Sequence, residues 1–211
     1  VSAGVNSEDA SRQAVDIIRE RLESVLLSEH VDAASVLDAM VDAAAQASGA
    51  ITTWAGDSDA TTVVAGCCIG RDVLGCWCGD SRAYRIRAGT VQRVTLDHSW
   101  AEGVVRQGVM STEEAAADPR AHMITRWLGE QDGVGPEIDT FHFSLDEGET
   151  LLCCSDGLYA YFSPPYGDPG EIGRILNEGS DLSVQLVDLQ SLALERGGHD
   201  DITIAALRVR Q

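Results

Sequence analysis

The sequence predicts an α+β fold in which mostly antiparallel strands are covered by helices. Patterns of helical period occupy the start of the chain and recur near its end, whereas short apolar runs of strand type fill the middle and close the chain. Regular alternation of strands and helices, which indicates a doubly wound parallel sheet, is missing. The length of 211 residues suits one domain, expected to span residues 1–211.

Two amphipathic helices are expected at the start of the chain, over residues 7–27 and 31–48. In both segments apolar residues recur every three or four positions, which places them on one face of a helix. Polar residues open the first segment and suit a helix N-terminus, where side-chain oxygens accept bonds from free backbone amides. Gly49 is expected to end the second helix, because glycine readily adopts the conformation found after helix C-termini.

Short runs rich in Val, Ile, Cys and aromatic residues come next, and they are typical of strands. Ala88-Gly89 is expected to form a tight hairpin turn between two of them. The expected strands cover residues 61–69, 73–78, 83–87, 91–94, 140–145, 150–154 and 202–209. After a proline-rich loop, two more helices are expected before the last strand, at residues 171–177 and 182–196.

The segment between residues 100 and 128 mixes helical patterns with breaks at Gly108 and Pro119. Ser111 and Glu114 have the spacing of a capping box. In that motif the serine hydroxyl accepts from the glutamate amide, and the glutamate carboxylate accepts from the serine amide. A short helix should therefore begin directly after Ser111.

Acidic residues lie next to expected strands at three distant places in the sequence. Asp80 follows the strand at 73–78, Asp156 follows the strand at 150–154, and Asp200-Asp201 opens the last strand. A carboxylate at the rim of a buried strand can hold a hard divalent cation, because the sheet fixes the oxygen while the rim admits water. The pattern suggests one metal site at a sheet edge.

Four short motifs give these turns a family context: Gly-Asp-Ser-Arg-Ala-Tyr at 79–84, Thr-Leu-Asp-His-Ser at 95–99, Ser-Asp-Gly-Leu at 155–158 and Asp-Asp-Ile-Thr at 200–203. Each motif is weak alone, but their order and spacing resemble the metal-dependent PP2C (PPM) serine/threonine phosphatases of bacterial type. The resemblance runs from about residue 10 to residue 209. It implies a four-layer αββα sandwich with two mostly antiparallel sheets flanked by helices. It also implies hydrolysis of protein phosphoserine and phosphothreonine by a metal-activated water.

The resemblance assigns roles to the acidic residues. Asp156 is expected to bridge two catalytic Mn²⁺ or Mg²⁺ ions and Asp200 to complete their ligands, so these two residues carry the catalysis. Asp80 is expected to serve a third, weaker ion together with Asp156. Gly157 and Asp201 should lie beside the ligands without binding metal, since many members have Asn at the position of Asp201. The motifs identify no substrate-binding residue.

The residues alone leave simpler interpretations open. An Asp before a Gly, as at Asp156, is often only a turn former. The pair Asp200-Asp201 could merely cap a strand, and Asp80 could bind the backbone of the turn that follows it. His98 is expected to be structural, because adjacent residues in Asp97-His98-Ser99 cannot face one another as a catalytic triad must. In the family this motif leads into a mobile flap, expected here at about residues 99–129.

Part of the family pattern is missing from this sequence. The family opens with a strand pair that carries an Arg for the substrate phosphate and an Asp-Gly turn that supplies another metal ligand. Two explanations compete: the strand pair lies outside this sequence, or the protein is a catalytically weak or inactive pseudophosphatase that binds phosphoproteins or a kinase. Either way, an exposed sheet edge is expected where the missing strands would pair.

The composition excludes some classes of partner. The net charge is −19 with only 15 basic residues, which argues against nonspecific nucleic-acid binding. No apolar run is long enough to span a membrane and no secretory signal pattern is present. Six cysteines lie inside strand-like runs and are expected to be buried free thiols, which indicates a cytoplasmic protein. We expect a monomer whose partners are phosphorylated substrates of a serine/threonine kinase, with no nucleic acid and no membrane among them.

Overall fold

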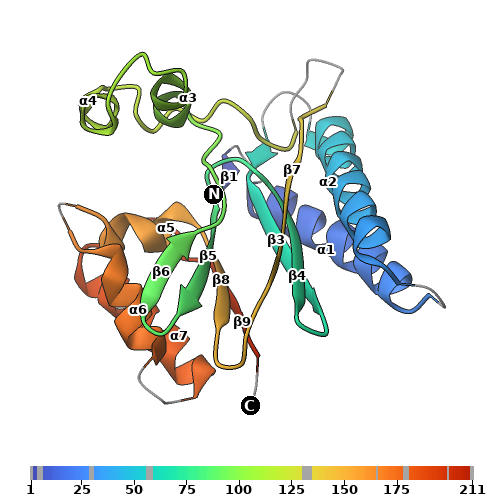
Figure 1. The fold of residues 1–211 in the computed structure, drawn as a ribbon. Coiled ribbons are helices and arrows are strands. Elements are labelled where there is room, and N and C mark those ends of the chain that lie inside the picture. The colour runs from blue at the N-terminus through green and yellow to red at the C-terminus, as the bar shows by residue number, and fades with distance from the viewer. Residues whose placement is uncertain are drawn as a thin grey trace.

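The computed structural model describes residues 2–3, 7–28, 31–55, 59–129, 135–164, 166–177, 181–198 and 200–209. Two antiparallel sheets lie face to face and helices cover both outer faces, so the described chain has four layers (Figure 1). The α+β class and the αββα layering expected from the sequence are confirmed.

The first sheet has the strand order β3-β4-β7 and the second the order β6-β5-β8-β9. A short pair, β1 (Ser2–Ala3) with β2 (Ala60–Thr61), stands apart from both. The strands of the two sheets are β3 (Val63–Ile69), β4 (Asp72–Cys78), β7 (Asp139–Ser144), β6 (Thr90–Arg93), β5 (Arg82–Arg87), β8 (Thr150–Cys154) and β9 (Ile204–Arg208). Among the described residues β3 pairs on one side only, so it forms an edge.

The outer helices bury apolar faces against the sheets. Helices α1 (Ser7–Leu26) and α2 (Ala33–Ala55) cover the first sheet, where Met40 packs with Leu74. Helices α6 (Pro169–Asn177) and α7 (Leu182–Glu195) cover the second sheet. Between the sheets lies a third apolar cluster, made of Val73, Trp77, Ala83, Phe141, Leu145, Leu151 and Cys153. Burial of these faces holds the layers together, since it removes apolar surface from water.

Helix α2 runs to Ala55, so the expected end at Gly49 is wrong. The buried hydroxyl of Ser48 accepts a bond of 2.9 Å from the amide of Gly129, and Ile51 is fully buried beside Leu128. These contacts hold the last turns of the helix against the core. A Cβ on Gly49 would meet nothing within 4 Å, so the glycine marks an open position inside the helix.

Two strands differ from their expected bounds for visible reasons. The run at 61–69 is divided at Thr62, whose hydroxyl bonds the hydroxyl of Ser81 at 2.8 Å while Thr61 pairs with Leu128. The last strand begins at Ile204, because the amide of Thr203 donates to the side chain of Ser155 at 3.0 Å. At Thr203 the Ser155 hydroxyl thus takes the place of a backbone partner in the sheet ladder.

The segment of residues 99–129 contains helices α3 (Trp100–Arg106) and α4 (Thr112–Ala117), which stand apart from both sheets in Figure 1. Both bonds of the capping box between Ser111 and Glu114 are present, so that prediction is confirmed. None of the described helices combines the length and apolar character needed to cross a membrane.

Candidate metal centre

Sheet register brings the three acidic turns to one end of the second sheet. Asp80 lies just before β5, Asp156 opens the short helix α5 (Asp156–Tyr159) directly after β8, and Asp200 lies just before β9. The start of β5 pairs with the end of β8, and the end of β8 pairs with the start of β9. Three positions that are distant in sequence therefore share one edge.

The carboxylates interact electrostatically. Burial, followed by the charge of Asp156, raises the pKa of Asp80 to about 6. Burial, followed by the charge of Asp200, raises the pKa of Asp156. The ionised carboxylate of Asp156 therefore repels those of Asp80 and Asp200. A bound cation would relieve this repulsion.

An unpartnered oxygen shows where such a cation fits. Oδ1 of Asp80 is buried and has no hydrogen-bond partner among the described residues. An ionised oxygen buried without a partner is costly, and hard divalent cations prefer carboxylate oxygen ligands. In the described part of the chain, however, no three His, Cys, Asp or Glu side chains are grouped closely enough to hold an ion. The residues present fit an ion that also keeps water or other ligands.

Gly157 and Asp201 hold the turn of Asp200 close to Asp156. A Cβ on Gly157 would clash with the backbone carbonyl of Asp201, so only glycine allows this approach. The hydroxyl of Ser155 donates to the same carbonyl at 3.1 Å, and the amide of Asp201 donates to Oδ1 of Asp200 at 2.8 Å. Asp200 and Asp201 are both exposed.

A half-buried ion pair beside the acidic edge was missed by the sequence reasoning. Arg82 donates from Nε and Nη2 to both carboxylate oxygens of Asp97, at 2.9 and 2.6 Å. Its guanidinium also lies 3.6 Å from the ring centre of Tyr159, on the helix that Asp156 opens. The sequence signal was an Arg two residues after Asp80 together with the Asp of the motif at 95–99, but their pairing depends on the fold.

His98 is placed as a structural residue, as expected. Its Nδ1 accepts from the amide of Gly79 at 3.0 Å, and its Nε2 lies 2.8 Å from Oδ2 of Asp139. The ring stacks on Trp77. Burial lowers the pKa of His98 although Asp139 opposes the shift. The histidine thereby fixes the turn that carries Asp80, and no serine side chain in the described part of the chain is hydrogen-bonded to its ring.

The cysteines are poorly suited to nucleophilic chemistry. None of the six forms a disulfide, and four of them are buried. Burial raises the pKa of Cys76 and of Cys153 to about 12, so both remain thiols at neutral pH. Cys67 and Cys68, on the edge strand β3, are only half-buried, which corrects the expectation that all six would be buried.

Known proteins resemble this chain in sequence and in fold, although no family model matches it. The serine/threonine phosphatase Stp of Listeria welshimeri is 34% identical over 144 residues, which are 68% of this chain and 54% of that protein. The chain spans about half the length of the curated relatives it matches.

Solved structures of phosphatases share the fold. The serine/threonine phosphatase of S. agalactiae aligns with a TM-score of 0.85 and 26% identity, over 100% of this chain and 85% of that chain. The catalytic domain of the serine/threonine phosphatase PstP, solved with two manganese ions, aligns with a TM-score of 0.77 and 24% identity. That alignment covers 100% of this chain and 85% of the PstP chain and shows likeness of fold.

Proposed function

We propose that this chain, which belongs to the bacterial PP2C (PPM) family of phosphatases, hydrolyses phosphoserine and phosphothreonine in proteins. The observation that carries the proposal is the acidic edge, where Oδ1 of Asp80 is buried without a partner beside Asp156 and Asp200. The names of the relatives favour a phosphatase over a binding module without catalysis.

Asp156 and Asp200 would hold two Mn²⁺ or Mg²⁺ ions, and Asp80 would hold a third together with Asp156. When bound, such ions lower the pKa of a coordinated water and neutralise charge on the phosphoryl group. PstP, a neighbour in fold, was solved with two manganese ions. Asp156 and Asp200 would be the catalytic residues, whereas Gly157 and Asp201 would only position the turn that carries Asp200.

The remaining residues would keep this edge rigid. The pair of Arg82 and Asp97 fixes the start of β5, and His98 fixes the turn before Asp80. The high pKa values of the buried cysteines favour direct attack by water over a covalent thiol intermediate. Residues 1–211 would form one phosphatase domain that lacks the family's N-terminal motif, with residues 99–129 as a flap beside the edge.

The partners follow from this chemistry. Substrates would be phosphoproteins made by a serine/threonine kinase. The free cysteines favour a cytoplasmic location, where thiols stay reduced. We propose a monomer that binds neither nucleic acid nor membrane, in line with its net charge of −19.

The test is hydrolysis of p-nitrophenyl phosphate and of a phosphothreonine peptide by the full gene product, with Mn²⁺ or with EDTA. Turnover should require Mn²⁺. Asp156→Asn and Asp200→Asn should each lower kcat by roughly 10²–10³-fold and weaken Mn²⁺ binding measured by calorimetry. Asp38→Asn, a matched change on the exposed face of α2, should leave both unchanged. Full activity in Asp156→Asn would refute the assignment.

A further inference from the structure

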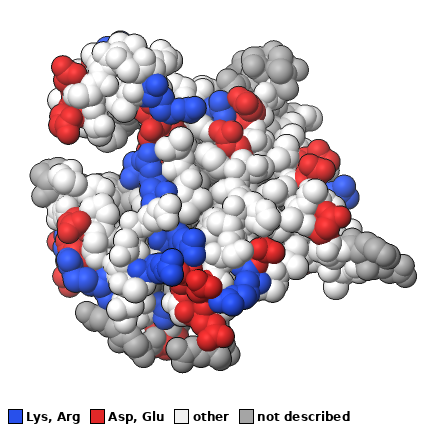
Figure 2. All heavy atoms as spheres, in the orientation of Figure 1, with Lys and Arg blue, Asp and Glu red and all other residues white. Residues whose placement is uncertain are grey.

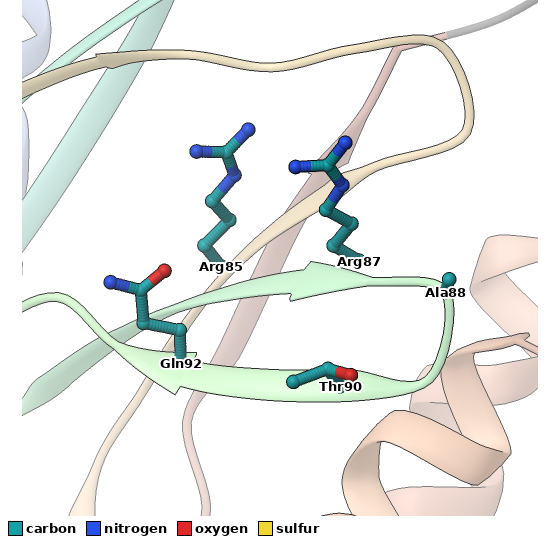
Figure 3. A pocket seen from close by; sticks show the side chains of 5 residues that line it. All are labelled: Arg85, Arg87, Ala88, Thr90 and Gln92. Atoms are coloured by element: carbon teal, nitrogen blue, oxygen red, sulfur yellow. The ribbon is translucent and has the colours of Figure 1, made fainter.

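The hairpin of β5 and β6 carries a pocket at the end of the second sheet opposite the acidic edge. Arg85, Arg87, Ala88, Thr90 and Gln92 line it, and its volume is about 340 Å³ (Figure 3). The two arginine side chains stand side by side on one face of β5, and Gln92 projects beside Arg85 from β6. Basic side chains also gather over this hairpin on the surface seen in Figure 2.

A buried carboxylate holds the arginines in place. Arg85 donates to Oε2 of Glu149 from Nη2 at 2.6 Å and from Nε at 3.0 Å, and Nε of Arg87 lies 3.1 Å from Oε1. The Glu149 side chain is only 4% exposed. Arg85 also lies over the ring of Phe143 at 5.5 Å. The carboxylate hydrogen-bonds Arg85, whereas Arg87 contacts it only as an ion pair, since Oε1 of Glu149 has no hydrogen-bond partner among the described residues. The three side chains together leave one formal positive charge in the pocket.

Several donors in the pocket remain free. Four groups of donors make no hydrogen bond to the described residues. They are Nη1 and Nη2 of Arg87, Nη1 of Arg85, the hydroxyl of Thr90 and the side-chain amide of Gln92. Two guanidiniums side by side, with a hydroxyl and a side-chain amide beside them, suit a tetrahedral oxyanion, because Arg donates paired bonds to phosphate oxygens. The Arg87 side chain is 68% exposed, so a ligand can reach it.

The pocket is too far from the acidic edge to belong to it. Strand β5 begins at Arg82, beside the acidic edge, and ends at Arg87, in the pocket. Arg85 and Arg87 lie three and five residues beyond Arg82, which is roughly 10 and 17 Å along the strand at about 3.3 Å per residue. A phosphate in the pocket and a phosphate at the acidic edge would therefore occupy separate sites that an extended peptide could bridge.

We propose that this pocket binds a phosphate group of a phosphoprotein substrate and so docks a second phosphorylated residue while the first is hydrolysed. The docking role rests on the proposed phosphatase function, whereas the binding of phosphate does not. In a chain with net charge −19, two adjacent arginines with free donors offer a local attraction to phosphate.

The binding test uses the metal-free protein and follows the Nε–H resonances of Arg85 and Arg87 by NMR during titration. The probes are inorganic phosphate, a phosphothreonine peptide and the same peptide without phosphate. We expect the phosphopeptide to shift both resonances and the unphosphorylated peptide to shift neither. Arg87→Gln should weaken phosphopeptide binding about three- to tenfold. Arg71→Gln, which removes an exposed arginine paired with Asp146 nearby, should not.

Thr90→Glu provides a second variant, because it adds a negative charge to the pocket and leaves the buried pair of Arg85 and Glu149 intact. Thr90→Glu should abolish the shifts caused by the phosphopeptide, whereas Arg87→Gln should only weaken binding. Equal phosphopeptide binding in the wild type, Arg87→Gln and Thr90→Glu would overturn the proposal. Shifts with inorganic phosphate but none with the phosphopeptide would identify a free-phosphate site and overturn the docking role.

An activity test separates this inference from the proposed function. With Mn²⁺, Arg87→Gln should raise KM about three- to tenfold for a peptide with two phosphothreonines and leave turnover of p-nitrophenyl phosphate unchanged. If Arg87→Gln leaves the KM for that peptide unchanged and turnover is normal, the docking role is refuted and the phosphatase function is not. Absence of turnover in the wild type would refute the phosphatase, while the NMR titration would still decide whether the pocket binds phosphate.

Discussion

Asp80 holds a carboxylate in surroundings that disfavour its charge. Its folded pKa of about 6 lies above its ordinary value of 3.8, mainly through burial. The folded state therefore binds a proton more tightly than the unfolded state, so its contribution to stability is full below pH 3.8 and is lost as the pH rises through 6. At neutral pH the ionised group destabilises the metal-free protein.

We predict that Asp80→Asn stabilises the metal-free protein by about 1–2 kcal/mol at pH 7.5, because the amide carries no buried charge. The gain should shrink at pH 5, where Asp80 is already mostly protonated. Thermal unfolding in EDTA measures both values, with Asp38→Asn as the control. A gain that grows as the pH falls would contradict the shift of the Asp80 pKa.

His98 titrates in the opposite sense. Burial lowers its pKa from the ordinary value of 6.5, so its stabilising effect is present above that value and is lost as the pH falls through the folded pKa. We predict that His98→Ala costs roughly 2–3 kcal/mol at pH 7.5, through lost bonds to Gly79 and Asp139, and less at pH 5. Urea unfolding at the two pH values checks this. His122→Ala, at an exposed position, should cost little at either pH.

The acidic residues could be located from the sequence because they lie at strand ends. Asp80, Asp156 and Asp200 border apolar runs whose limits are visible, and antiparallel pairing then places them on one edge. The contact of Arg82 with Tyr159 could not be predicted in this way. It depends on how a strand and a short helix face each other, which a pattern along one chain does not specify.

The turn of Asp200 depends on the close approach of two backbones at Gly157. A Cβ there would clash with the carbonyl of Asp201. We predict that Gly157→Ala displaces this turn and weakens Mn²⁺ binding about tenfold or more, measured by calorimetry. Gly103→Ala, in α3 where a Cβ meets nothing within 4 Å, should keep full binding. Unchanged affinity in Gly157→Ala would exclude Asp200 as a ligand.

Local signals predicted some features of the helices and strands and missed others. The capping box at Ser111 involves only two residues that lie three positions apart, so the sequence alone predicts it. The continuation of α2 past Gly49 depends on Ser48 bonding Gly129, a residue far along the chain. Thr62, where the strand run is divided, likewise has its hydroxyl bonded to the distant hydroxyl of Ser81. Such long-range polar contacts override local propensity.

The order of apolar patterns along the sequence predicts the four layers. It does not predict which residues of the two sheets contact each other. Strand β4 is buried on both faces, with Leu74 under α2 and Val73 between the sheets. A continuous apolar run predicts such a strand without showing which neighbour covers each face. The close approach of Gly66 to Leu151 across the sheets appears only in the folded chain.

The net charge of −19 should influence which substrates reach the acidic edge. A strongly negative molecule attracts basic peptides and repels acidic ones, and salt screens both effects over a Debye length of about 10 Å at 0.1 M. We predict that kcat/KM for an arginine-rich phosphopeptide falls as ionic strength rises from about 0.02 to 0.2 M, whereas that for an acidic phosphopeptide rises. Steady-state assays with the two matched peptides measure both slopes. Each peptide carries a single phosphate, so the arginine pocket of the β5–β6 hairpin is not bridged to the acidic edge. Parallel slopes would mean that the local arrangement at the acidic edge, and not the overall field, governs association.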